Sequence, residues 1–135
     1  MVEQHILDSF QTMWGPFPEP VMLIHKTRTI LAVNDLARAM GIPVGTKCFS
    51  LNPEAGPDAD HCASCQANLA LKSGQTISTE ERAGEHTIIG YWMPLKEFPD
   101  VYVHFGVGTN KAMAAVNNTL DSHRPNEIDV ATDAL

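Results

Sequence analysis

The order of its strand-like segments constrains the fold of this chain more than any other feature of the sequence. Two runs rich in β-branched and aliphatic residues, 21–26 and 29–34, are separated only by a short turn, which predicts a β-hairpin. Three further strand-like runs, 75–82, 87–95 and 101–107, follow a helical stretch. Helices grouped between the second and third strands predict an α+β fold, in which a five-stranded antiparallel sheet carries helices on one face.

Helical patterns flank this core and interrupt it. Residues 2–14 place apolar side chains at helical spacing, and the prolines that follow end this amphipathic helix. Asn34 or Asp35 can cap a short helix that ends at Met40. Residues 61–72 also have a helical pattern.

The chain therefore divides into one folded core with extensions. We expect an N-terminal amphipathic helix at 1–14, a core at 15–109, a C-terminal helix at 110–121 and a disordered tail at 122–135.

Length and charge exclude several classes of protein. The 135 residues suit a single domain, and no apolar run approaches the ~18 residues of a membrane-spanning helix. The first residues lack the basic start and apolar block of a signal peptide, so we expect a cytoplasmic protein without a membrane partner. The net charge of -7 and the scattered basic residues argue against nucleic acid as a partner.

Two stretches of the chain resemble PAS domains. PFPEPVMLIHKTRTILAVNDLARAMG resembles the opening of such a domain, where a β-hairpin leads to an Asn that begins the next helix. GTKCFSLNPEAGPDADHCASCQANLALKSGQ is similar to a subgroup with Gly-x-x-Cys-aromatic followed by Cys-x-x-Cys. The resemblance covers residues 8–109 and implies a dimeric sensor for a small ligand, cofactor or redox state. It also implies a signalling partner such as a kinase or a transcription regulator. The chain departs from the family where the last strand runs into GVGTN.

Three cysteines and a histidine form a candidate metal or redox site. Cys62 and Cys65 are three apart, so on the expected helix their sulfurs share one face. Cys48 precedes a polar loop that can fold back beside them, and His61 adds a further donor. This is the Cys₃His set of a tetrahedral zinc site. An iron–sulfur cluster is a second alternative, although a fourth cysteine is missing.

The same cysteines have two interpretations without a metal. They can form a disulfide switch, with Cys62 activated by the N-terminus of the expected helix. They can also be reduced packing residues, because a free cysteine behaves as a small hydrophobe. Covalent c-type haem is excluded because Gln66 follows Cys65. A non-covalent axial haem ligand could come from His61 or His104.

The last two strands supply candidates for a ligand pocket or a dimer face. Tyr102 and His104 share one face of their strand and either line a cavity or face a helix or a second subunit, and we favour the second interpretation. Trp92 shares its face with Gly90, and a glycine within a strand permits close approach of a ligand or backbone. We expect a homodimer through residues 2–14 and the outer face of the sheet.

The sequence predicts a sensory module rather than an enzyme. It has no Gly-rich phosphate loop, no Gly-x-Ser-x-Gly elbow and no His-Glu-x-x-His motif. A small thiol-disulfide oxidoreductase using Cys62 and Cys65 is the catalytic alternative, but its motif should follow a strand in a βαβ unit. A dimerisation module without a ligand is the third alternative.

Overall fold

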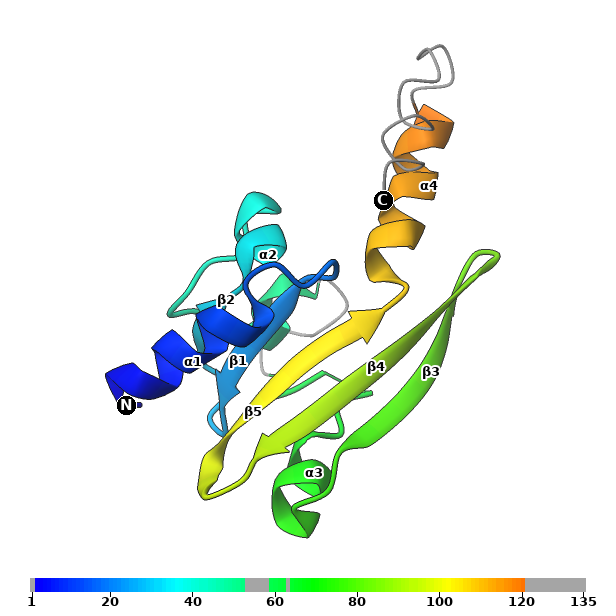
Figure 1. Cartoon of the computed structure of the whole chain (residues 1–135). Helices are drawn as coiled ribbons and strands as arrows, with labels where there is room; N and C mark the ends of the chain where they lie inside the picture. The colour runs from blue at the N-terminus through cyan, green and yellow to red at the C-terminus, as the bar shows by residue number, and fades with distance from the viewer. Residues whose placement is uncertain (1, 53–58, 63, 121–135) are drawn as a thin grey trace.

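The computed structural model of the chain describes residues 2–52, 59–62 and 64–120, and Figure 1 shows the arrangement of its elements. The predicted tail at 122–135 lies outside the described residues. The elements, in chain order, are α1 (Gln4–Trp14), β1 (Val21–His25), β2 (Ile30–Val33), α2 (Asp35–Ala39), the 3₁₀ turn η1 (Cys48–Leu51), α3 (Ala67–Ser73), β3 (Ile77–Ala83), β4 (His86–Leu95), β5 (Phe98–Val107) and α4 (Thr109–Leu120).

The five strands form one antiparallel sheet in the order β2-β1-β5-β4-β3. The chain therefore makes the hairpin β1–β2, leaves the sheet for the helices, and returns at the far edge with β3. The last strand, β5, closes the sheet beside β1, where Val21 is paired with Phe105 and His25 with Val101. The predicted five-stranded antiparallel α+β fold is confirmed.

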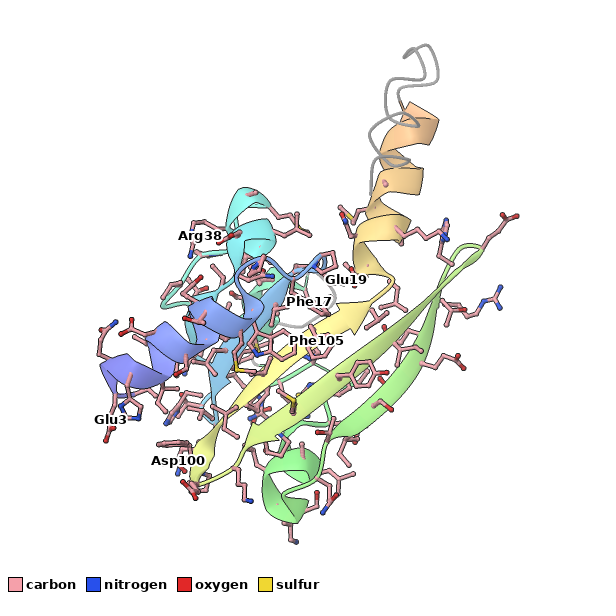
Figure 2. The ribbon with its side chains drawn as sticks, in the orientation of Figure 1. Glu3, Phe17, Glu19, Arg38, Asp100 and Phe105 are labelled. Carbon is pink, nitrogen blue, oxygen red and sulfur yellow. The ribbon has the colours of Figure 1, made fainter. Side chains whose placement is uncertain are left out.

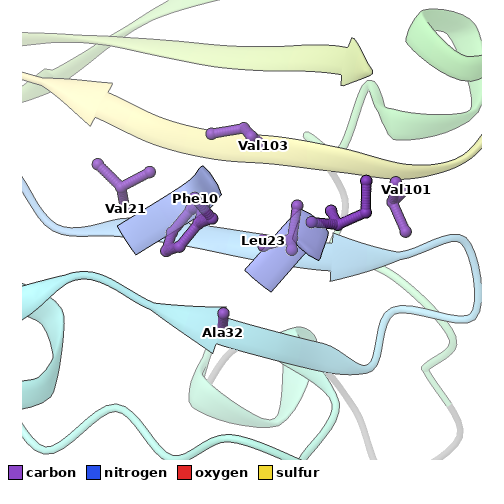
Figure 3. Close-up of a cluster of buried hydrophobic side chains, with 7 residues drawn as sticks. Phe10, Val21, Leu23, Ala32, Val101 and Val103 are labelled. Atoms are coloured by element: carbon purple, nitrogen blue, oxygen red, sulfur yellow. The ribbon is translucent and has the colours of Figure 1, made fainter. Parts of the chain in front are cut away.

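Helix α1 covers the outer face of the sheet at β1 and β5 (Figure 1). Its side chains Ile6 and Phe10 are buried against Val21, Leu23 and Val103, as Figure 3 shows for most of this cluster. Burying each such side chain contributes about 1.5–3 kcal/mol. The apolar stripe of residues 2–14 is therefore used within the chain, and the homodimer expected through this helix stays a prediction.

The opposite face of the sheet carries α2, η1 and α3. Ala67 and Ala70 of α3 are fully buried and pack against Ile24, Trp92 and Tyr102. Two alanines on the buried side of a helix let its backbone approach the sheet closely, because they add little volume at the contact. The cysteine-bearing segment also lies over this face of the sheet.

The predicted helix at 61–72 is wrong in its first half, because α3 begins only at Ala67. Cys62 and Cys65 instead belong to a turn, in which the Cys65 N–H donates to the Cys62 carbonyl at 3.0 Å. Gln66 has φ -111° and ψ 15°, outside the helical region, and offers no side-chain cap. The turn and the helix are therefore separate units, and the two cysteines do not lie one helical turn apart.

The strand boundaries at the β4–β5 connection also differ from those expected. The strand-like run expected at 101–107 begins earlier, because Phe98 already pairs with Leu95 and only Lys96 and Glu97 form the turn. Glu97 has φ 72° at this tight turn. Across the described part of the chain, no helix combines the length and the apolar character that crossing a bilayer requires.

Asn34 confirms the predicted cap of α2 and does more than cap it. Its Oδ1 accepts from the Ala37 N–H at 3.1 Å and from the Val21 N–H at 2.9 Å. Its Nδ2 donates to three backbone carbonyls, that of Trp14 at the end of α1 and those of Phe17 and Glu19 in the segment before β1. The side chain is fully buried, so it joins α1, β1 and α2 where water cannot replace these bonds.

Candidate functional site

A cavity of about 410 Å³ lies between the helical face of the sheet and the segments that cover it. Its walls come from η1, from the turn before α3, from β3, β4 and β5, and from the first residue of α4. Residues at the start of β1 and after α2 complete them. Six of the residues singled out in the sequence line it: Cys48, Cys62, Cys65, Trp92, Tyr102 and His104. The fold thus brings the cysteines and the strand residues to one site.

All three cysteines are free and half-buried. Burial raises the pKa of the Cys48 thiol, and the neighbouring Cys62 and Cys65 raise it further. The Tyr102 hydroxyl hydrogen-bonds to Cys48 and opposes this shift. Burial also raises the pKa of Tyr102 far above its usual range, so this hydroxyl keeps its proton and donates to the sulfur. Cys48 is accordingly a protonated thiol at neutral pH.

His61 does not join the cysteines. It is exposed, its Nδ1 contacts the carboxylate of Asp60, and it is not part of the cavity wall. The hydrogen bond from His61 is the main cause that lowers the pKa of Asp60. Among the residues that the structure describes, no group of three or more His, Cys, Asp or Glu side chains is arranged to hold a metal ion. The zinc or iron–sulfur cluster expected from Cys48, Cys62, Cys65 and His61 stays a prediction.

Trp92 and His104 form the aromatic part of the wall. Their rings stack with centroids 4.7 Å apart and planes inclined by 23°. The two residues are register partners on β4 and β5, which explains the contact. His104 Nδ1 lies 2.9 Å from the Tyr91 carbonyl oxygen, which can only accept, so Nδ1 carries the hydrogen. Burial lowers the pKa of His104, and the ring is neutral at pH 7.

The two glycines of this wall admit neighbouring side chains rather than a ligand. A Cβ on Gly90 would lie 3.4 Å from Cη2 of Trp92, so the indole ring lies across the space that the sequence offered for a ligand. A Cβ on Gly106 would lie 2.7 Å from Thr109 Oγ1. Gly106 therefore allows the first turn of α4 to approach the sheet.

Two charged residues near the site were not recognised from the sequence. Arg28 is only 5% exposed, and its Cζ lies 6.0 Å from the centroid of the Tyr102 ring. Its NH groups donate to the Lys26 carbonyl at 2.6 Å and to Asn68 Oδ1 at 3.0 Å. An arginine in a hairpin turn is normally solvated, whereas this one contacts Tyr102 of β5 and Asn68 of α3, both distant in sequence.

Glu19 is the second residue that the sequence did not reveal. Its carboxylate accepts from the Gly108 N–H and the Asn110 N–H, both at 2.7 Å. Figure 2 shows Glu19 beside the start of α4. Its partners are about 90 residues away in the sequence, so no local pattern could indicate the contact.

Comparisons with known proteins identify the architecture. No family model and no curated protein sequence matches the chain. A solved domain of an HTR-like protein from Haloarcula marismortui aligns with a TM-score of 0.50 and 18% identity, over 66% of this chain and 95% of that one. A sensory box sensor histidine kinase from Vibrio cholerae aligns with a TM-score of 0.54 and 16% identity, over 76% of this chain and 86% of that one. The fold is PAS-like.

In this PAS-like fold the cavity reaches the point where the chain leaves the sheet. Gly106 at the end of β5 and Thr109 at the start of α4 both line it, and so does Pro20 just before β1. Figure 1 shows α4 leading away from the sheet at this point. The cavity wall therefore includes residues on both sides of the junction between β5 and α4.

Proposed function

We propose that this chain is a sensory module that binds a small molecule in the cavity and reports its presence through α4. The observation that carries the proposal is the composition of the cavity wall. The wall joins the buried aromatic pair Trp92 and His104 to Thr109, the first residue of the exit helix.

The size and the chemistry of the cavity suit a ligand. Small-molecule sites are usually concave, about 300–1,000 Å³ in volume and mostly apolar, with a few polar groups that fix orientation. The cavity of about 410 Å³ is lined by apolar residues such as Met22 and Ile42, and by the polar side chains of Thr79 and His104. A purely structural core would fill this volume with side chains.

The output of the module is a protein contact. Helix α4 leaves the sheet beside the cavity. A partner protein or a second copy of the chain can bind its exposed side, where Met113 is 46% exposed. One structural neighbour is described as a sensor histidine kinase, which supports a kinase as the class of partner. The homodimer expected from the sequence is part of this proposal.

Native mass spectrometry of the whole chain tests the binding step. The protein is examined as purified and after incubation with candidate metabolites, and a bound molecule appears as a mass increment lost on unfolding. Thr79→Phe places a large ring into the cavity and should abolish the increment. Ser78→Phe is the matched control, because Ser78 is exposed and its side chain leaves the same strand on the opposite face. Equal increments in both variants would contradict binding in this cavity.

Thiol oxidation is a second candidate, favoured by the three free thiols in one cavity. With hydrogen peroxide as the oxidant, two thiols would form one disulfide while peroxide is reduced to two molecules of water. The protonated state of Cys48 makes it a slow nucleophile, which favours the ligand-binding proposal. Alkylation of the thiols before and after peroxide, read by mass, separates the two candidates.

A further inference from the structure

The three cysteines of the cavity wall differ in what their side chains contribute to the fold. Cys48 packs against two of the buried apolar clusters, and its sulfur accepts from the Tyr102 hydroxyl. Cys65 packs against the cluster that contains Tyr102. Among the described residues, Cys62 is the cysteine that belongs to no apolar cluster, although it is half-buried and lines the cavity. Its thiol is therefore available to the cavity rather than committed to the core.

Two hydrogen bonds fix the position of Cys62. Asn52, at the end of η1, donates from Nδ2 to the Cys62 sulfur at 3.7 Å. The Cys62 carbonyl accepts from the Cys65 N–H at 3.0 Å, which closes the turn before α3. Ser64 belongs to the same turn and lines the same cavity, and its hydroxyl can donate to a carbonyl oxygen. The turn thus presents a held thiol and a hydroxyl to whatever enters.

A buried positive charge lies within range of the thiols. Arg28 is only 5% exposed, and its Nε has no hydrogen-bond partner among the described residues. Its other NH groups donate to uncharged acceptors, the Lys26 carbonyl and Asn68 Oδ1. Cys48 senses the charge of Arg28 and that of Cys62 alike, so the guanidinium and the three thiols form one electrostatic neighbourhood. A cation beside a thiol favours the thiolate, which is the nucleophilic form.

The rest of the cavity suits a small apolar molecule. Met22, Ile42 and Trp92 contribute apolar surface to its wall. Met40 and Leu51 line it as well, and they are nevertheless 44% and 42% exposed. Exposed apolar side chains at the edge of a groove are typical of ligand sites. An apolar molecule can therefore enter past these two residues and reach the thiol.

We propose that the cavity captures small apolar electrophiles, of the class of α,β-unsaturated ketones, on the Cys62 sulfur. In this addition the sulfur forms a bond to the β-carbon, the carbon–carbon double bond becomes single, and the thiol proton ends on the α-carbon. No electrons pass to an oxidant, so the step needs no further reactant. The inference rests on the proposed function, because the electrophile must first enter the same cavity, but it adds a bond that persists when the chain unfolds.

The enone trans-3-nonen-2-one and its saturated analogue 2-nonanone test the capture on the intact chain. The chain is treated with a chelator and a reductant, desalted and incubated with the enone at pH 7, and peptide mapping by mass spectrometry locates the adduct. Cys62 should react at least about 10-fold faster in the folded chain than in urea, because the cavity holds the enone beside the sulfur. The ketone cannot form the bond, so it should compete and slow the reaction. Burial alone would have the opposite effect and slow the thiol in the folded chain.

Cysteine variants separate capture from folding. Cys62→Ser should abolish the fast reaction and keep the melting temperature of the wild-type chain, because this side chain belongs to no apolar cluster. Cys65→Ala is the matched control in the same turn, and its fast reaction at Cys62 should persist.

The outcomes distinguish this inference from the proposed function. Equal rates at Cys62 in the folded and unfolded chains, or a fast adduct on Cys48 or Cys65 instead, overturn the capture. If 2-nonanone still binds, with a mass increment that is lost on unfolding, the proposed function remains intact. If neither 2-nonanone nor the candidate metabolites bind, the proposed function falls as well.

Discussion

Glu19 ties the segment before β1 to the start of α4, and its removal should loosen that helix without unfolding the sheet. The two carboxylate oxygens each accept one backbone N–H at 2.7 Å, from Gly108 and from Asn110. Gly108 directly precedes α4 and Asn110 belongs to its first turn, where backbone N–H groups have no partner within the helix. Glu19→Ala leaves these two donors to water.

The magnitude follows from the kind of bond and its exposure. A hydrogen bond to a charged group contributes about 1.5–3 kcal/mol when it is shielded from water. The contact at Gly108 is partly buried and that at Asn110 is exposed, so we discount the sum to about 2 kcal/mol. Because 1.4 kcal/mol corresponds to a factor of ten, local opening at these amides should become about 30-fold more frequent.

Amide hydrogen exchange measured by NMR reads this opening residue by residue. In Glu19→Ala, the amides of Gly108 and Asn110 should exchange about 30-fold faster, whereas the amide of Val103 in the sheet should not change. Glu85→Ala is the matched control, because Glu85 is an exposed acid in the β3–β4 turn. Unchanged exchange at Gly108 and Asn110 in Glu19→Ala would refute the assignment of Glu19 as the tie to α4.

Three further predictions concern stability and chemistry. Asn34→Ala should lower the free energy of unfolding by about 3 kcal/mol in urea titrations, since a helix cap and several buried backbone partners are lost together. A loss below about 1 kcal/mol would contradict the role of Asn34 in joining α1, β1 and α2. The folded-state pKa of His104 is lowered, so protonation of this ring favours the unfolded chain. The free energy of unfolding should therefore be highest above about pH 6.5 and decline on acidification. His104→Gln should flatten this part of the pH dependence. In an insulin-reduction assay the chain should show no turnover, because Cys62 and Cys65 lie in a turn within an antiparallel fold, and steady turnover would reinstate the oxidoreductase alternative.

The sequence predicted the sheet well because the signals for strands and turns are local. The hairpin of β1 and β2 was evident from two apolar runs and a short link, and the cap at Asn34 from a residue type whose side chain bonds the next turn. The α3 boundary failed for a physical reason. A Cys-x-x-Cys stretch satisfies helical spacing, yet its own turn hydrogen bond and the dihedral angles of Gln66 interrupt the helix.

The candidate site was only partly predictable. Alternation along β5 placed Tyr102 and His104 on one face of the strand. It could not decide whether these side chains face a cavity, a helix or a second subunit. The structure shows that two of these apply, since Tyr102 packs against α3 and also lines the cavity. The sequence did not predict the contacts of Glu19 and Arg28, because their partners are distant in the sequence and approach them only in the folded chain.

The same closure explains how one small sheet can connect a cavity to an exit helix. The segment before β1 is held on one side by Asn34, whose amide donates to the carbonyl of Glu19. On the other side the Glu19 carboxylate accepts from the Gly108 and Asn110 N–H groups at the start of α4. Pro20 of this segment and Thr109 of α4 both line the cavity, so the proposed ligand would contact both ends of the tie. A ligand can shift a conformational equilibrium only as far as it contacts the two states differently. A ligand that shifts α4 relative to Pro20 would strain or break the hydrogen bond from the Gly108 N–H to Glu19, so its binding should change exchange at the Gly108 amide.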